Sequence, residues 1–315
     1  MVRNSPPFIN PADAVGIDRA AALLREGALV AVPTETVYGL AARADSAEAV
    51  AGIYRAKGRP DFNPLIVHVP TVAAAERLAV FDDRARALAA AFWPGALTLV
   101  LPLRPDAGIV PAVTAGLPTL ALRCPAHPVM RAVLKAAGLA LAAPSANRSG
   151  GVSPTSAAHV AASLGAGAAM ILDGGQAEQG LESTIVALRP HGWSLLRPGP
   201  ITAAQIAGIL GGVADEAAGA GRIEAPGQLA SHYSPGKPVR LGALMGQDDE
   251  FMIGFGPVAG AISLSSAGDL AEAASRLYLC LHEASAAAQP RIAVAPVPDE
   301  GIGAAINDRL RRAAV

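Results

Sequence analysis

Four short polar segments stand out in a sequence that is otherwise rich in alanine. They lie at the ends of apolar runs that predict buried strands, and they cover residues 33–40 (PTETVYGL), 57–64 (KGRPDFNP), 142–150 (AAPSANRSG) and 181–186 (LESTIV). Together they supply hydroxyls, amides and cations. Loops at strand ends are the usual ligand-binding places of α/β folds. The four segments therefore predict one site for a polar ligand.

Cations are the most informative members of these segments. Lys57 is one of only three lysines in the chain, and it flanks a glycine together with Arg59. Two cations and an amide, Asn63, in a loop stiffened by prolines suit an anion such as a polyphosphate. The alternative is that the cations only complement a helix C-terminus, which contributes about 0.3–1 kcal/mol. His68, on an apolar strand, is either a core histidine or a functional one.

The other segments also have a functional and a purely structural interpretation. Ser145 and Asn147 form an oxygen-binding nest or an ordinary Asx/Ser turn. The hydroxyls of residues 34–36 bind a ligand or cap a following helix. Residues 181–186 bind a ligand or merely enter a strand. Arg123 also ends an apolar strand, and the whole set contains no nucleophile–base pair. The set predicts binding of a phosphate-rich ligand beside a small polar one, with catalysis by positioning and charge neutralisation.

The elements that position these segments alternate between helix and strand along the chain. The patterns predict helices at 19–26 (capped by Asp18), 47–57, 82–93, 128–137 and 202–210, and strands at 28–33, 65–69, 97–103, 119–123, 139–143, 169–172, 184–188 and 193–196. Residues 211–237 are rich in Gly, Ala and Pro and predict a linker. A second α/β pattern follows, with strands at 239–244, 252–255, 261–264 and 292–297 and helices at 269–288 and 302–312. This order predicts a two-domain α/β protein.

Composition excludes several classes of protein. The chain has 315 residues, 52% of them apolar, and a net charge of −1, which argues against disorder. No apolar run approaches the ~18–20 residues that a membrane span requires, and residues 1–10 do not resemble a signal peptide. Two distant cysteines predict neither a disulfide framework nor a zinc site, so a cytoplasmic location is expected. Residues 1–200 are only slightly basic, which is weak support for nucleic-acid binding. There is no Walker A loop, and residues 254–259 match a dinucleotide motif without the helix that must follow it.

The segments resemble the YrdC-type family of L-threonylcarbamoyladenylate synthases. The motifs that carry the resemblance are PTETVYGL at 33–40, KGRP at 57–60 with Asn63-Pro64-Leu65 and His68, PSAN at 144–147, ESTIV at 182–186 and RPG at 197–199. HYSP at 232–235 and AINDRL at 305–310 are similar to the tail of the family's long form. The resemblance implies a YrdC-like twisted mixed sheet around a deep cavity over residues 9–206, a linker over 207–237, and a Rossmann-like α/β domain over 238–315.

The resemblance also implies an activity. The family makes L-threonylcarbamoyladenylate and pyrophosphate from L-threonine, bicarbonate or CO2, and ATP with Mg²⁺, and is therefore a nucleotidyltransferase. Its product is handed to a tRNA threonylcarbamoyl transferase complex that modifies the adenosine beside the anticodon. No membrane partner is implied, and direct contact with tRNA is left open.

Site residues carry over from the family motifs position by position. L-threonine would be held by Thr34, His68, Arg123, the backbone at Ala143, and Ser183. ATP would be held by Lys57, Arg59, Asn63, Thr119, Ser145, Asn147, Ser153, Arg197 and Tyr233. Lys57 and Arg59 would act in catalysis by neutralising the phosphates, and no metal ligand is assigned.

One motif departs from the family pattern. The linker often carries basic residues before its His-Tyr pair, whereas residues 226–233 read PGQLASHY. A phosphate-binding role for the linker before His232 is therefore doubtful. A lid role for residues 232–235 remains, with Gly227 and Gly236 as hinges.

Two other functions remain as alternatives. The first domain could be a double-stranded RNA or tRNA-binding module without catalysis, in which case RNA affinity would be salt-sensitive. The chain could also be a carbamoyltransferase that uses carbamoyl phosphate, as YrdC-like domains in hydrogenase maturation do. Those proteins carry acylphosphatase and zinc-finger regions that this chain lacks.

Overall fold

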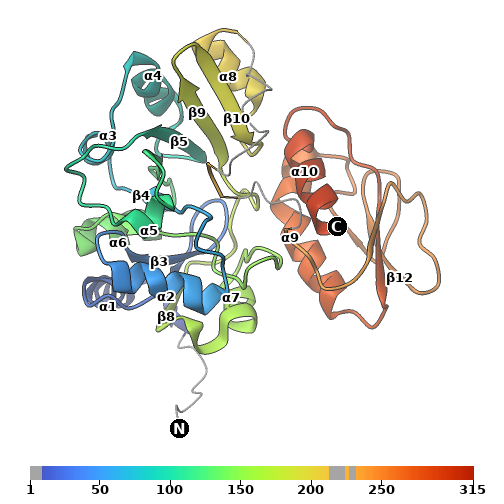
Figure 1. The fold of residues 1–315 in the computed structure, drawn as a ribbon. Helices are drawn as coiled ribbons and strands as arrows, with labels where there is room; N and C mark the ends of the chain where they lie inside the picture. Colours follow the sequence, from blue (N-terminus) through green and yellow to red (C-terminus); the bar gives the residue numbers. More distant parts are fainter. Residues whose placement is uncertain (1–8, 213–223, 227–231) are drawn as a thin grey trace.

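A computed structural model describes residues 9–212, 224–226 and 232–315 of the chain. The described part forms a large α/β unit and a smaller one beside it (Figure 1). The α/β class expected from the sequence is confirmed. The expected hinge Gly227 and the non-basic residues 228–231 lie outside the described residues, and the domain limits at 206 and 237 stay predictions.

The large unit is built on a ten-stranded mixed sheet. Its order is β1-β8-β2-β3-β7-β4-β6-β5-β9-β10. The strands are β1 (Ile9–Pro11), β2 (Val30–Val32), β3 (Gly39–Arg43), β4 (Ile66–His68), β5 (Leu97–Pro102), β6 (Thr119–Arg123), β7 (Leu141–Ala142), β8 (Met170–Asp173), β9 (Thr184–Arg189) and β10 (Gly192–Arg197). The parallel pair β4 and β6 has His68 in register with Arg123, so the two expected threonine ligands lie side by side at one end of the pair.

Helices cover this sheet. They are α1 (Ala14–Arg25), α2 (Ala47–Lys57), α3 (Val72–Glu76), α4 (Asp83–Phe92), α5 (Pro111–Thr114), α6 (Pro128–Ala137), α7 (Ala157–Leu164) and α8 (Ala203–Leu210), with a 3₁₀ turn at Gly165–Gly167. Local signals set their ends, as in α2, where the Ser46 hydroxyl accepts a hydrogen bond from Ala49 N and Gly58 closes the helix at φ 60°. A left-handed residue at this position is a common helix stop. It leaves Lys57 and Arg59 on either side of the turn.

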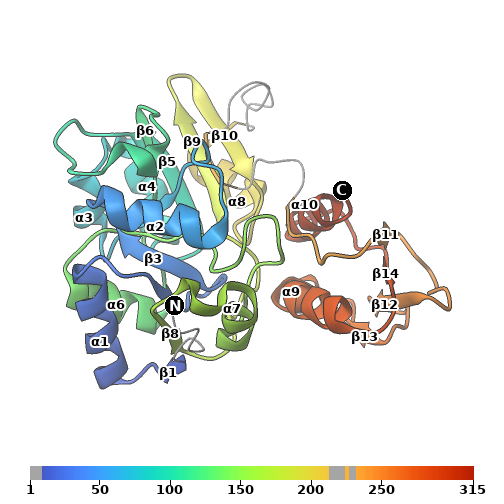
Figure 2. The same ribbon diagram turned by 60° about the horizontal axis from the view of Figure 1, so that its bottom comes forward.

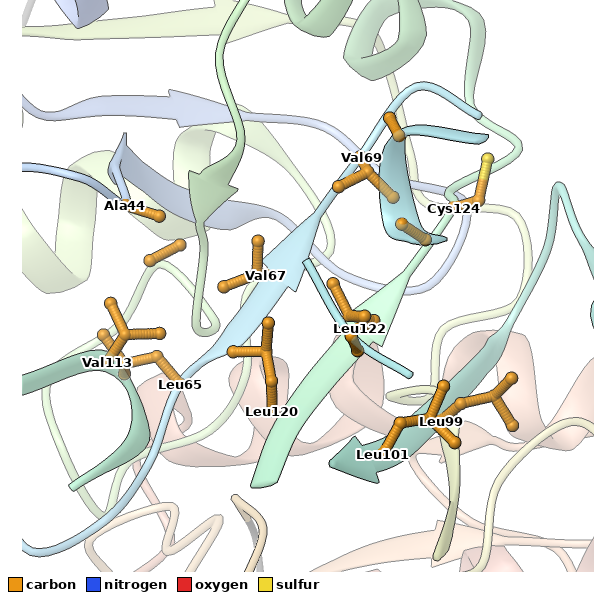
Figure 3. Close-up of a cluster of buried hydrophobic side chains, with 14 of the residues drawn as sticks. Ala44, Leu65, Val67, Val69, Leu99, Leu101, Val113, Leu120, Leu122 and Cys124 are labelled. Carbon is orange, nitrogen blue, oxygen red and sulfur yellow. The ribbon is translucent and has the colours of Figure 1, made fainter. Parts of the chain in front are cut away.

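The main core lies under strands β4, β5 and β6. Leu65, Val67, Leu99, Leu120 and Leu122 are almost completely buried there (Figure 3). These residues alternate with those that face the other side of the sheet, because side chains on a strand point to opposite faces in turn. Packing of one face therefore fixes the direction in which His68 and Arg123 point.

The second unit has a parallel four-stranded sheet in the order β11-β14-β12-β13, which confirms the Rossmann-like expectation. Its elements are β11 (Val239–Leu241), β12 (Glu250–Gly254), β13 (Ile262–Ser263), α9 (Leu270–Ala286), β14 (Arg291–Val294) and α10 (Gly303–Ala313). Helices α9 and α10 lie on the side that faces the large unit (Figure 2). The core of the second unit also takes in Val37, Val152, Leu181 and Tyr233, so the two units share buried apolar surface.

The structure differs from the sequence-based expectation in several places, and strand β1 and the short helices α3 and α5 are among the elements that were not expected. Helix α1 begins at Ala14, because the Asp13 carboxylate, rather than Asp18, caps it by accepting from Gly16 N. Residues 39–43 form strand β3, which pairs antiparallel with β2 and β7. Helix α7 was not expected, although the Ser156 hydroxyl caps it.

No described helix combines the length and apolar character needed to cross a bilayer.

Candidate active site

The predicted polar segments come together around one cavity. It lies where β2, β4, β6 and β7 end and where β9 begins, and residues of the segment between α8 and β11 close its other side. All five residues expected to hold threonine line it: Thr34, His68, Arg123, Ala143 and Ser183. Since these residues span about 150 positions of sequence, the sheet order is what assembles them.

The turn after β2 is organised by its own hydroxyls. Thr34 Oγ1 donates to the carbonyl of Val37 at 2.7 Å and accepts from the backbone N–H groups of Thr36 and Val37 at 3.2 Å. Strand β3 follows, so the alternative that these hydroxyls cap a helix is wrong. Thr34 is 2% exposed, and its hydroxyl is fixed at the cavity wall.

Arg123 is held by a buried carboxylate that sequence reasoning did not assign to it. Its Nη2 donates to Glu35 Oε1 at 2.6 Å, its Nη1 to Thr36 Oγ1 at 2.8 Å, and its Nε to the carbonyl of Gly95 at 3.1 Å. Burial by itself raises the pKa of Glu35, but the charge and hydrogen bond of Arg123 lower it to about 2. The guanidinium is therefore fixed in direction, and two of its five N–H groups remain for a ligand.

His68 is neutral in this setting. Burial, followed by the nearby charge of Arg123, lowers its pKa to about 3. Its Nδ1 is buried and has no hydrogen-bond partner among the described residues. A neutral imidazole with a free nitrogen at a cavity wall can exchange a hydrogen bond with a small polar ligand.

The residues expected to hold the nucleotide divide into two groups. Four of them line the cavity: Arg59, Ser145, Arg197 and Tyr233. The other five do not line it: Lys57, Asn63, Thr119, Asn147 and Ser153. Thr119 shares the sheet face of Arg123 by strand alternation, but it lies at the opposite end of β6.

Lys57 lies behind the cavity wall rather than in it. Its Nζ donates to the carbonyls of Ser145 at 2.6 Å and Asn147 at 2.5 Å, and the side chain is 3% exposed. Burial, with a further contribution from Arg59, lowers its pKa well below the ordinary value. In this conformation Lys57 fixes the loop that carries Ser145, and its amine does not face the cavity.

Two arginines give the cavity its positive wall. Arg59 donates from Nη2 to the carbonyl of Pro64 at 3.0 Å, which keeps its side chain inside the 57–64 loop. It therefore does more than complement the dipole at the C-terminus of helix α2. Arg197 donates from Nε to the carbonyl of Ser183 at 3.0 Å. Gly199 allows this approach, because a Cβ there would lie 2.5 Å from the backbone nitrogen of Thr184. Both guanidiniums remain positioned for an anion.

The linker covers the cavity from the side of the second unit. His232 and Tyr233 are 8% and 1% exposed and both line it. The space that water can enter is about 50 Å³. Ligand sites for molecules of nucleotide size have roughly 300–1,000 Å³. A nucleotide can therefore enter only after these residues move.

Sequence reasoning gave no role to Glu182 and Arg309, which form a buried ion pair at 2.9 Å. Glu182 lines the cavity. Arg309, on α10, contacts Glu182 and does not itself line the cavity. A signal was present: Arg309 shares the apolar face of α10 with Ile306, Leu310 and Ala313, where a charge requires a buried partner. No group of three or more His, Cys, Asp or Glu among the described residues could hold a metal ion.

Two family models together match most of the chain. A Sua5/YciO/YrdC family model described as "Telomere recombination" matches residues 22–199, and one described as "Threonylcarbamoyl-AMP synthase, C-terminal domain" matches 201–315. The threonylcarbamoyl-AMP synthase of Bacillus subtilis is 42% identical, over 95% of this chain and 92% of its own. The crystal structure of Pyrococcus abyssi Sua5 complexed with L-threonine superposes with a TM-score of 0.88 at 35% identity, covering 98% and 96% of the two chains. Escherichia coli YciO, at 20% identity and a TM-score of 0.53, covers 61% of this chain and 94% of its own and shares the fold of the first unit.

Proposed function

The chain belongs to the Sua5/YrdC family, in its two-domain form, and from this premise we propose that it is a threonylcarbamoyl-AMP synthase. The substrates would be L-threonine, bicarbonate or CO2, and ATP, and the products threonylcarbamoyl-AMP and pyrophosphate. The observation that carries the proposal is the convergence of all five expected threonine residues and four expected nucleotide residues on one cationic cavity.

The threonine end of the cavity would bind and orient the amino acid. Two free N–H groups of Arg123 would pair with its carboxylate, while Glu35 keeps the guanidinium in place. The neutral His68 and the hydroxyl of Ser183 would contact the polar groups of the substrate. Ser183 Oγ already exchanges a hydrogen bond with Thr98 Oγ1 at 2.7 Å, so its direction is fixed.

The reaction would then run in two steps. The amine of threonine adds to CO2 and loses a proton, which gives a carbamate. A carbamate oxygen attacks the α-phosphorus of ATP, the bond to the β-phosphate oxygen breaks, and pyrophosphate leaves. Arg59 and Arg197 would compensate the charge of the phosphates, and alignment would supply most of the rate enhancement.

Mg²⁺ would enter with ATP as part of the substrate. The described residues offer no cage of carboxylates for a resident ion. This fits the habit of Mg²⁺ of binding through substrate phosphates and water, with few protein ligands. Lys57, whose amine holds the 144–147 loop, would support the nucleotide through Ser145.

The product would be consumed by a tRNA threonylcarbamoyl transferase complex, since a mixed anhydride of this kind is too reactive to accumulate. We propose a cytoplasmic location, with which two free and buried cysteines, Cys124 and Cys280, are compatible. The RNA-binding and carbamoyl phosphate alternatives are outcomes of the test.

The test is mass spectrometry of the products formed from ATP, L-threonine and ¹³C-bicarbonate. The expected result is the label in an adenylate that also contains threonine, with one pyrophosphate for each adenylate. Pyrophosphate release that is equal with and without threonine would contradict the proposal. Turnover of carbamoyl phosphate, or salt-sensitive RNA binding without ATP turnover, would support an alternative.

A further inference from the structure

Arg309 belongs to the second unit but makes its contacts at the cavity. It is completely buried. Its Nε donates to Glu182 Oε2 at 2.9 Å, its Nη1 to Asp308 Oδ2 at 2.6 Å and its Nη2 to the carbonyl of Pro198 at 2.9 Å. Its guanidinium carbon lies 5.3 Å from the centre of the Tyr233 ring. One side chain of α10 therefore touches the segment before β9, the turn after β10, and the linker.

Glu182 accepts hydrogen bonds from two residues besides Arg309. Its Oε1 accepts from Ser153 Oγ at 2.5 Å, and its Oε2 also accepts from the Tyr278 hydroxyl at 2.8 Å. Burial by itself raises its pKa, but the charges of Arg309 and Arg197 and the hydrogen bonds of Ser153 and Arg309 lower it to about 2. Glu182 is thus ionised at neutral pH, and two of its hydrogen-bond donors, Tyr278 and Arg309, come from the second unit.

An ionised carboxylate in this wall raises a problem for an anion-binding cavity. Glu182 lines the same space as Arg59 and Arg197. Without a partner it would cancel part of their charge and repel phosphates, and it could swing toward either guanidinium. Arg309 supplies the compensating charge from behind, so the two arginines of the wall remain available.

We propose that Arg309 is a positioning residue for the nucleotide: by fixing and neutralising Glu182, it keeps the wall at Arg59 and Arg197 positive. The proposal rests on the proposed function, because it takes the bound anion to be ATP. It makes the affinity for ATP depend on docking of the second unit, whereas the five residues expected to bind threonine all belong to the first unit. Arg309 acts through Glu182 and Tyr233 and does not reach the ligand.

The first test is Arg309→Met, with ATP and L-threonine binding measured by titration calorimetry on the full chain. ATP binding is expected to weaken roughly 10- to 100-fold, since a buried charge loses its partner. Threonine binding should stay within about 3-fold. In steady-state assays the KM for ATP should rise while kcat at saturation changes much less. Arg311→Met is the matched control, because Arg311 is an exposed cation on the same helix.

The second test removes both charges of the Glu182–Arg309 ion pair. In Glu182→Gln/Arg309→Met the wall has no uncompensated carboxylate, so ATP binding is expected to return to within about 5-fold of wild type. Arg309→Lys should bind ATP with intermediate affinity, because it keeps the positive charge but loses the guanidinium that contacts Glu182 and the carbonyl of Pro198 at the same time. ATP binding of the double variant as weak as that of Arg309→Met would overturn the proposal, as would wild-type affinity in a folded Arg309→Met.

Circular dichroism separates these results from loss of structure. If Arg309→Met does not fold, Arg309→Lys decides, since it keeps a positive charge but loses the guanidinium contacts to Glu182 and Pro198. Its ATP binding should be weaker than that of the wild type while threonine binding is unchanged, and wild-type ATP affinity would count against the proposal. Failure of the wild-type protein to bind ATP at all would instead contradict the proposed function.

Discussion

The threonine end and the nucleotide end of the cavity are built differently. All five residues expected at the threonine end line it, and they come from one sheet or the turns at its edge. At the nucleotide end, four of the nine expected residues line it. One of these, Tyr233, lies in the linker, and the carboxylate beside them is held by α10. One end is therefore complete within the first unit, and the other end is completed by later parts of the chain.

This difference has a thermodynamic meaning. Side chains that are already fixed, such as Arg123 and Thr34, lose little freedom when a ligand binds, so their contacts contribute fully to affinity. Residues that must move before ATP enters, such as His232 and Tyr233, lower the apparent affinity by the fraction of open molecules. We therefore expect threonine binding to be insensitive to changes in the linker and in the second unit.

The largest effect is expected from Arg123→Ala. It removes the charge proposed for the threonine carboxylate and leaves Glu35 buried without its partner, so threonine-dependent activity should fall more than about 100-fold. The free energy of unfolding should fall by roughly 3–5 kcal/mol. Calorimetry should show that ATP binding changes far less, and the exposed Arg131→Ala serves as control. A loss of ATP binding with intact threonine binding would reverse the assignment of the two ends.

The next effect is the converse change, Arg59→Ala. Loss of a buried guanidinium from the positive wall should weaken ATP binding roughly 10- to 100-fold, while threonine binding is retained. Calorimetry with each substrate alone gives both values. Arg55→Ala, one helical turn earlier on the exposed side of α2, is the control for loss of a positive charge. Equal losses for the two substrates would mean that the ends are not separate.

A smaller effect concerns pH. Burial lowers the pKa of His68, at the threonine end, and of His232, at the nucleotide end, to about 3. An unfolded histidine titrates near its ordinary value, so below about pH 6.5 the unfolded chain binds protons that the folded chain does not. The free energy of unfolding should thus fall between pH 7 and 5, by up to about 2 kcal/mol for each histidine at pH 5.

Urea unfolding at the two pH values measures this loss. His68→Gln and His232→Gln should each reduce it. Burial raises the pKa values of the Glu35 and Glu182 carboxyl groups, but their arginine partners lower them to about 2, so they contribute stability above the ordinary glutamate range and lose it only as the pH falls below that range. If the pH dependence of the unfolding free energy were unchanged in His232→Gln alone, His232 would not be buried against the cavity in solution. The two ends would then differ even more, because the linker would lie away from the nucleotide end.

The smallest effect is expected from Ser153→Ala. The Ser153 hydroxyl donates to Glu182 and lies behind the wall, so its loss should change ATP binding no more than about 5-fold. Titration with ATP measures this effect. Ser149→Ala is the control, because Ser149 lies between β7 and α7 like Ser153 and is also outside the cavity lining. A 100-fold loss of ATP affinity would mean that Ser153 contacts the nucleotide directly. The nucleotide end would then resemble the threonine end more closely, since one more of its expected residues would touch the ligand.

The sequence predicted local features well and long-range partners poorly. Helix α6 and strand β6 have the predicted bounds, because a helix-starting proline, a closing glycine and an apolar run each act locally. Strand β3 was missed, since its sequence GLAAR has three small residues and no alternating pattern, and it pairs only in the context of β2 and β7.

The same limit applies to the site. Motifs identified which residues gather, but they could not show that Lys57 turns its amine toward the carbonyls of Ser145 and Asn147. They also could not pair Glu182 with Arg309, because the two residues are 127 positions apart and only the packing of α10 on the first unit brings them together.

That separation also has a consequence during synthesis. Glu182 is made first, and at roughly 5–20 residues per second Arg309 follows on the order of ten seconds later. Throughout that interval the nascent first unit holds a carboxylate without its cation, and it exposes the apolar side chains of Val37, Val152 and Leu181 that later enter the second core. All five residues of the threonine end are thus made before the Arg309 that pairs with Glu182 at the nucleotide end, which is complete only when translation has passed α10.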